Sequence, residues 1–355
     1  MKKTKIQWCH SSINPVMGCE GCELWPGAGL VGDKIAAALA ELGQTPASQV
    51  MIQNAIDGRA FSAIYAERES IATQIAGPAP SKARTTVVDS IRRTGKCYAG
   101  LLGTNRAGRK GYADQFEIPK CYPGRMAEAA RWGMPTSKEN ETKPWLAGLP
   151  RLIFVSDMGD ALSSSVPFEY LKQEIIENVN SPEGQRHIWL WVTKRPDRMA
   201  KFAAWLSEQG VALPDNLVAM TTVTSQSKAG RVDQLRKVPS RWRGLSVEPL
   251  FEAVKLDLSG IDWVIVGGGS DVLAEPFHVE WALDLQQQCR EAGAACFIKQ
   301  LGKHPFYQGK PLPLDNQHGG DWTEWLPEWR VREMPAAFRE YGQNAAPVRQ
   351  TQTTR

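Results

Sequence analysis

The sequence predicts an α/β fold: a full or partial (βα) barrel of parallel strands with a helical insertion near its start. From residue 151 onward, six short apolar runs rich in β-branched residues recur, and helical stretches lie between several of them. Continuous apolar runs are typical of strands buried on both faces, and their alternation with helices indicates a parallel sheet. A doubly wound open sheet is the alternative.

The expected strands and helices follow one another closely in the second half of the chain. Six strands leave a barrel of the usual size incomplete, so one or two more are expected before residue 150. The strands are expected at 151–156, 188–193, 217–222, 243–247, 262–267 and 294–299, and the helices at about 167–179, 196–209, 226–237 and 279–292.

Four segments are expected along the chain. Residues 1–27 form an N-terminal segment with a cysteine loop, and 28–95 a helical insertion with helical stretches at about 31–42, 48–77 and 82–94. A Gly-Pro-Ala-Pro-Ser run at 77–81 breaks the insertion. Residues 96–305 form the barrel core, and 306–355 a C-terminal extension whose polar tail, from about Gln343, is expected to be disordered.

Composition bounds the class of protein. A hydrophobic content of 42% over 355 residues is enough for a sizeable core, and the net charge of +4 permits contact with nucleic acid without requiring it. The seven cysteines are an odd number in a long chain, which argues against a secreted disulfide scaffold. No signal peptide and no apolar run of about 18 residues is found, so we expect a cytoplasmic protein without a membrane span.

The most informative stretch is a Gly-rich loop that holds two cysteines. Cys19 and Cys22 lie two residues apart, and Cys97 has similar glycine neighbours. Three thiolates on such backbone can hold a metal ion or an iron–sulfur cluster. Cys121 competes with Cys97 for the third place, because an aromatic residue follows each. The other three cysteines, Cys9, Cys289 and Cys296, are expected to be ordinary buried thiols.

Polar residues or glycines follow all six expected strands. In βα barrels the chemistry lies at the carboxyl ends of the strands, so these residues predict a ring of polar groups around one site. Carboxylates there would hold ribose hydroxyls or an amino group, and lysines a carboxylate or phosphate. The candidates are Ser156, Asp157, Asp160, Thr193, Lys194, Glu248, Gly267, Gly268 and Lys299.

Each of these candidates also has a purely structural interpretation. Asp157 or Asp160 would cap the following helix. Lys194 would join a salt bridge at a helix start, and the glycines from Gly267 would form a flexible turn. That glycine run lacks the dinucleotide-binding fingerprint. A further loop, residues 92–131, is rich in Gly, Arg and Lys; it would either contact phosphates of nucleic acid or be a solvated loop.

Several separate motifs between residues 10 and 302 resemble one known family. They are Asn14-Pro15, Gly18-Cys19, Gly21-Cys22, Cys97-Tyr98-Ala99, Thr193-Lys194-Arg195-Pro196, Ser246-Val247-Glu248-Pro249-Leu250, Trp263-Val264-Ile265-Val266-Gly267-Gly268 and Phe297-Ile298-Lys299-Gln300. The chain resembles a phage and prophage family of unknown function, described as three-Cys-motif proteins, which look like distant relatives of radical SAM enzymes.

The resemblance implies a radical SAM-like barrel with a 4Fe-4S cluster held by Cys19, Cys22 and Cys97. S-adenosylmethionine would chelate the open iron and, on reduction by an electron donor, be cleaved to a 5′-deoxyadenosyl radical. Tyr98 would lie near the adenine. The sequence departs from the usual Cys-x3-Cys-x2-Cys pattern, because 74 residues separate Cys22 from Cys97.

Three functions follow from these observations. The first is a radical SAM enzyme that modifies, rearranges or repairs a nucleobase in phage DNA, such as a hypermodified thymine, in the host cytoplasm; the basic 92–131 loop would contact the DNA. The second is a non-enzymatic zinc protein that binds nucleic acid, with Cys121 as the fourth ligand. The third is an enzyme on the same barrel that does not use S-adenosylmethionine.

Overall fold

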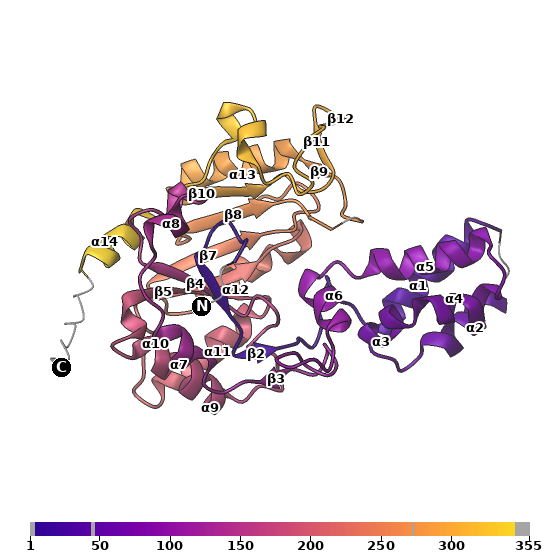
Figure 1. Ribbon diagram of the computed structural model, residues 1–355, viewed down its shortest axis with the longest axis horizontal. Helices are drawn as coiled ribbons and strands as arrows, with labels where there is room; N and C mark the ends of the chain where they lie inside the picture. Colours follow the sequence, from indigo (N-terminus) through magenta and orange to yellow (C-terminus); the bar gives the residue numbers. More distant parts are fainter. Residues whose placement is uncertain (1–3, 44–46, 272, 345–355) are drawn as a thin grey trace. The chain divides into compact units, whose positions relative to one another are not determined.

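The computed structural model describes residues 4–43, 47–271 and 273–344 (Figure 1). The chain forms two compact units, and each is treated by itself below. Unit 1 comprises Met1–Pro15, Cys121–Asp157 and Ser164–Arg355, and unit 2 comprises Val16–Lys120 and Met158–Ser163. Within the described ranges, no helix has the length and apolar character needed to cross a membrane.

Unit 1 is built on a seven-stranded parallel sheet that curls into a half-barrel (Figure 1). The α/β class and the partial barrel are therefore confirmed. In spatial order the strands are β1 (Ser11–Ile13), β4 (Arg151–Val155), β5 (His187–Thr193), β6 (Leu217–Thr222), β7 (Trp242–Val247), β8 (Trp263–Gly267) and β10 (Ala295–Gln300).

All six strands expected after residue 150 are present, with ends shifted by one residue at most. Nearly every residue in them is buried, which is why they form continuous apolar runs. The additional strand expected before residue 150 is β1, which pairs with β4. This strand has only three residues, Ser-Ser-Ile, so it is too short and too polar to be recognised from the sequence.

The two faces of the sheet are covered differently. On the concave face the side chains of alternate strand residues form one apolar cluster with Trp8, Leu146, Leu149 and Phe338 from outside the sheet. The opposite face is covered by α11 (Pro196–Ser207), α12 (Gly230–Arg236) and α13 (Val279–Ala292). For example, the ring of Trp191 lies 5.9 Å from that of Phe202 in α11. Strand residues thus alternate between core and helix layer.

The remaining elements of unit 1 are short. A three-stranded sheet is made of β9 (Phe277–His278), β11 (Pro305–Tyr307) and β12 (Lys310–Pro311). The helices are α7 (Arg125–Ala130), α8 (Ser137–Asn140), α9 (Phe168–Leu171), a π-helical segment (Lys172–Ile176), α10 (Glu177–Asn180) and α14 (Ala336–Asn344), with 3₁₀ turns at Pro144–Leu146, Gly184–Arg186, Gln226–Lys228, Trp322–Glu324 and Pro327–Trp329.

Residues beyond 305 belong to the half-barrel rather than lying apart from it. Phe338 of α14 is fully buried in the concave cluster. The chain at 331–333 runs along β10: Ile298 N donates to Val331 O, and Glu333 N donates to Cys296 O. This contact covers the edge of the sheet. The predicted disorder of the tail concerns mainly residues 345–355, which lie outside the described part.

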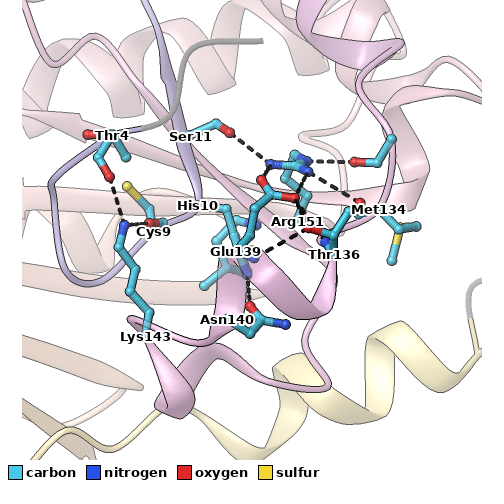
Figure 2. Close-up of polar contacts among 12 residues, drawn as sticks. Thr4, Cys9, His10, Ser11, Met134, Thr136, Glu139, Asn140, Lys143 and Arg151 are labelled. Atoms are coloured by element: carbon cyan, nitrogen blue, oxygen red, sulfur yellow. Dashed lines mark hydrogen bonds and ion pairs between the residues drawn. The ribbon is translucent and has the colours of Figure 1, made fainter.

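A buried polar cluster lies at the amino ends of β1 and β4 (Figure 2). Arg151 is fully buried and pairs with Glu139 at 3.0 Å, and it also donates to Ser11 Oγ. Lys143 Nζ donates to the carbonyl oxygens of Thr4, Ile6 and Cys9. Because the charged groups of Arg151, Glu139 and Lys143 all have partners, the cluster ties the N-terminal segment to the sheet at low cost.

Unit 2 contains the predicted helical insertion. Its apolar centre includes Trp25, Phe61 and Phe116, whose rings pack edge to face. Glu117 accepts hydrogen bonds from Trp25 Nε1 and from Ser62. The stretch expected to be helical at 48–77 is divided into three helices. The helices are α1 (Ala28–Ala40), α2 (Ala47–Ile56), α3 (Phe61–Ala66), α4 (Arg68–Ala76), α5 (Lys82–Thr94) and α6 (Tyr98–Asn105). The short strand β2 (Val16–Met17) also belongs to unit 2, and β3 (Lys120–Cys121) spans the boundary between the units.

Candidate functional site

The loop of Cys19 and Cys22 lies beside Cys97 in unit 2. Cys22 and Trp25 form a tight turn, with hydrogen bonds of 3.2 and 2.9 Å between their backbones. Within this turn, Leu24 O accepts hydrogen bonds from the amides of Lys96 (2.9 Å) and Cys97 (3.0 Å). The structure therefore brings Cys97 back to the turn that begins at Cys22, although 74 residues separate the two in sequence.

Glycines make this close approach possible. A Cβ atom on Gly100 would lie 2.6 Å from Trp25 Cδ2, and one on Gly95 would lie 2.5 Å from Phe61 Cε1. Real Cβ atoms are essentially never closer than 3.0 Å to another side chain. The glycines that flank Cys97 are thus required by the Trp25 and Phe61 rings. They are packing positions, in addition to any role in ligand access.

The cysteines differ in their surroundings. Cys19, Cys22, Cys97 and Cys121 are partly exposed, whereas the remaining three cysteines are buried, as expected. Cys97 caps α6, where its Sγ accepts from Gly100 N at 3.4 Å; amides at a helix start stabilise a thiolate. Burial, and secondly the Glu174 carboxylate, raise the pKa of Cys121, which belongs to unit 1. Cys121 is thus the poorer thiolate ligand.

The side chains are not arranged as a site for a single metal ion. Across residues 4–43, 47–271 and 273–344, no three His, Cys, Asp or Glu side chains converge as metal ligands. Three thiolates are the donor type that a 4Fe-4S cluster takes, but within the described ranges the side chains of Cys19, Cys22 and Cys97 are not grouped as ligands and would have to come together to hold it.

At the carboxyl edge of the half-barrel, the structure brings together three of the predicted residues. Glu248 Oε1 lies 2.5 Å from Lys299 Nζ, and their side chains are only 14% and 18% exposed. Gly267 lies at the end of β8, the strand between them, where an added Cβ would be 3.3 Å from Glu248 Cδ. Gly268 is packed against Phe277 and Leu301 O, so it serves close packing.

Two further candidates lie at the end of β4. Asn14 Nδ2 donates to Asp157 Oδ1 at 2.5 Å, which links the chain after β1 to the chain after β4. Ser156 has a left-handed backbone conformation, φ 71°, unusual for a residue with a side chain. Its Oγ is buried and has no hydrogen-bond partner within the described chain. A ligand at this edge of the sheet would find a polar atom there.

The other candidates have different settings. Thr193 Oγ1 accepts from Arg195 N at 2.9 Å, and in β5 it shares the helix-covered face with Trp191. Lys194 is half-buried at the end of β5. Asp160 belongs to unit 2, where its amide donates to Gly18 O beside Cys19 and its carboxylate accepts from Leu162 N. Tyr98 is 54% exposed at the start of α6.

One residue near the Glu248–Lys299 pair gave no sequence signal. Arg332 donates to the carbonyl oxygens of Ile298, Lys299 and Gly320. Its guanidinium lies 4.1 Å from the ring centre of Trp145 and 4.8 Å from that of Trp322. It holds the end of β10 in place from a distant part of the sequence, so no local pattern could have identified it.

The basic loop has both engaged and exposed side chains. In unit 2, Arg106 donates to Tyr112 Oη, and Lys120 pairs with Asp114 at 3.4 Å. Arg125 of unit 1 lies 3.9 Å above the ring of Tyr122. The residues of unit 2 that are basic and exposed between positions 92 and 110 are Arg92, Arg93, Arg106, Arg109 and Lys110.

Comparisons with known proteins give one match. No curated protein and no solved structure matches the chain. A family model described as a protein of unknown function (DUF5131) matches residues 92–342, which include Cys97, Cys121 and the carboxyl edge of the half-barrel, but not Cys19 or Cys22. Because this match covers well over half of the sequence, the chain belongs to the DUF5131 family of proteins of unknown function.

Proposed function

We propose that the protein is a radical SAM enzyme whose 4Fe-4S cluster is held by Cys19, Cys22 and Cys97. The observation that carries the proposal is the pair of hydrogen bonds from Lys96 and Cys97 to Leu24 O. If the three cysteines were ordinary structural thiols, there would be no reason for Cys97 to lie beside the loop of Cys19 and Cys22 after a long insertion. A cluster does give that reason.

The properties of the thiols favour Cys97 over Cys121 as the third ligand. Metal ligation requires a thiolate. Cys97 is partly exposed at the start of a helix, whereas burial raises the pKa of Cys121. Three ligands would leave one iron open for S-adenosylmethionine, and the bound cluster would supply the electron for its reductive cleavage. An external electron donor would then be needed.

The proposed substrate is a nucleobase in DNA, such as a modified thymine in a phage genome. Its support is the group of exposed basic side chains of unit 2, which includes Arg92 and Arg109. Contacts of this kind with phosphates make binding strongly dependent on salt. Replacing Arg92, Arg93 and Arg109 together by Gln should weaken binding of duplex DNA and reduce its salt dependence. An unchanged affinity would remove DNA from the proposal.

The cluster is tested by anaerobic purification, iron and zinc analysis and an absorption spectrum, followed by dithionite and S-adenosylmethionine. We expect a brown protein that releases 5′-deoxyadenosine. Cys97→Ala should lose the iron, while Cys121→Ala and the buried-thiol control Cys289→Ala should keep it. A colourless protein with one zinc, lost in Cys121→Ala, would replace the proposal with a zinc-binding nucleic-acid protein.

A further inference from the structure

The second site suggested by the structure lies wholly in unit 1, at the carboxyl edge of the half-barrel. Its centre is the ion pair of Glu248 and Lys299, which lies on the concave side. Ser246, Ile265 and Phe297 are neighbours in register on β7, β8 and β10, and Ile265 and Phe297 belong to the concave cluster. Glu248 and Gly267 each follow one of these residues by two positions and continue the same row, and the Lys299 ammonium group reaches it through the ion pair with Glu248.

The strand that carries Lys299 is irregular at this point. Ile298 pairs with Val266 and Gln300 with Gly267, so Lys299 is an extra residue in the ladder. Such bulges re-aim a side chain, and they are frequent next to active sites. Arg332 Nη2 donates to Lys299 O at 3.1 Å and thereby holds the bulge. The direction of the Lys299 ammonium group is therefore built into the fold.

A contribution to stability does not by itself explain why Glu248 and Lys299 form an ion pair here. A mostly buried ion pair loses the hydration of both charges, and apolar residues of similar size often stabilise a fold equally well. The two charges meet directly over the end of the intervening strand, where a Cβ on Gly267 would lie 3.3 Å from Glu248 Cδ. Two opposite charges held above a glycine suit a ligand that itself carries both a positive and a negative charge.

We propose that the Glu248–Lys299 ion pair, set across Gly267, is a binding site for the zwitterionic end of an α-amino acid. The ligand ammonium group binds the Glu248 carboxylate, and the ligand carboxylate binds the Lys299 ammonium group. Each protein charge exchanges one partner for another of the same sign, so no charge is left unpaired.

Two sources can supply this group: the methionyl end of S-adenosylmethionine, or an amino acid present in the substrate. The first source takes its ligand from the proposed function and applies while no cluster is bound, because a cluster would itself bind the amino and carboxylate groups of S-adenosylmethionine. The second source goes beyond the proposed function. The binding is measured without reductant and compared between the wild type and Cys19→Ala, so that failure of the cluster and failure of this site are told apart.

The test is calorimetric titration of the full chain with S-adenosylhomocysteine, 5′-methylthioadenosine and free methionine, followed by a thermal-shift screen of the other α-amino acids. We expect Lys299→Met and Glu248→Gln to weaken binding of the amino-acid ligands at least about tenfold, because one charge-assisted contact is lost. Lys255→Met is the matched control: Lys255 pairs with Asp284 at 2.7 Å on the surface of the same unit.

The outcomes separate the sources. Binding of S-adenosylhomocysteine but not of 5′-methylthioadenosine supports the first source, and stronger binding of a free amino acid supports the second. 4-(Methylthio)butanoic acid is methionine without the ammonium group, and it should not bind under either outcome. If no amino-acid ligand binds, or if Lys299→Met binds it as the wild type does, the proposal is overturned. The reversed pair, Glu248→Lys with Lys299→Glu, should restore thermal stability but not binding, whereas a purely structural pair has no binding to lose.

Discussion

Glu248 and Lys299 form their ion pair across an intervening strand. The Glu248 side chain extends from the end of β7 and the Lys299 side chain from β10, and β8 lies between them. Neighbouring strands are about 4.8 Å apart, so the two backbones are separated by roughly twice that distance. The side chains meet above Gly267, where a Cβ would approach both Glu248 Cδ (3.3 Å) and Gln300 Cγ (3.4 Å). The pair therefore depends on the absence of a side chain at position 267.

The first prediction concerns this glycine. Gly267→Ala should lower the free energy of unfolding by less than about 1 kcal/mol, because the atoms near the new methyl group belong mainly to flexible side chains. It should nevertheless weaken binding of the amino-acid ligand at least about fivefold, since Glu248 must move. Calorimetry and urea denaturation measure the two effects. Gly230→Ala, where a Cβ would meet nothing within 4 Å, is the control. Equal affinity in both variants would contradict the proposed geometry.

The second prediction concerns Arg332, whose guanidinium lies beside the rings of Trp145 and Trp322, which contact each other. Arg332→Met should lower the free energy of unfolding by about 2–4 kcal/mol, because buried carbonyl groups lose their donor and the cation–π contacts are lost. Arg332→Lys should recover only part of this, since an ammonium group cannot reproduce the fork of contacts.

The control for Arg332 is Arg241→Met. Arg241 is half-exposed and lies 3.9 Å from Asp215, so its replacement should change the free energy of unfolding by less than about 1 kcal/mol. Urea denaturation of the three variants provides the comparison. A loss for Arg332→Met as small as that of the control would show that the end of β10 does not need this residue.

Much of the fold could be predicted from the sequence because its main signal is local. Strands such as β5 and β8 are buried along their whole length, so their apolar runs end close to where the strands end. β1 could not be placed, since three residues carry no period. The structural part played by the C-terminal segment was also missed, because the burial of Phe338 depends on packing against distant strands.

The candidate site was predictable in part for the same reason. The polar strand ends indicated Glu248, Gly267 and Lys299, but their contact depends on strand order and on the bulge in β10. Thr193 follows the same pattern at the end of its strand, but its hydroxyl accepts a hydrogen bond from the backbone at the start of a helix. The support from Arg332 comes from outside the barrel core expected at 96–305, so spacing alone could not find it.

The third prediction is a loss of stability in mild acid. Burial lowers the pKa of both His10 and His187 to about 4, with nearby arginine charges contributing. His10 Nδ1 accepts from Leu152 N, so a proton on this nitrogen would break the bond. The unfolded chain takes up protons near pH 6.5, and stability is therefore lost as the pH falls from about 6.5 to 4.

The expected loss between pH 7 and pH 5 is about 2 kcal/mol for each of these histidines. His10→Asn keeps an acceptor near Nδ1 but cannot titrate, so it should remove about half of the pH-dependent change. His318→Asn, at an exposed position, should leave the change as it is. Urea denaturation at the two pH values provides the measurement.

Glu139 titrates in a lower pH range than the two histidines. Burial alone would raise its pKa, but hydrogen bonds from Arg151 and Thr136 lower the pKa to about 2. Its contribution to stability is therefore lost only below about pH 4.5.

The last prediction tests the contact between the cysteine loop and Cys97. Gly100→Ala places a methyl group 2.6 Å from Trp25 Cδ2, so either the indole ring or the start of α6 must move. We expect unit 2 to lose about 1–3 kcal/mol of stability and the purified protein to lose most of its iron. Gly29→Ala, in α1 with nothing within 4 Å of its Cβ, should keep both. A Gly100→Ala protein that retains full iron content would mean that the cluster does not depend on the backbone contact between Leu24 and Cys97, and the proposed ligand set would lose its main support.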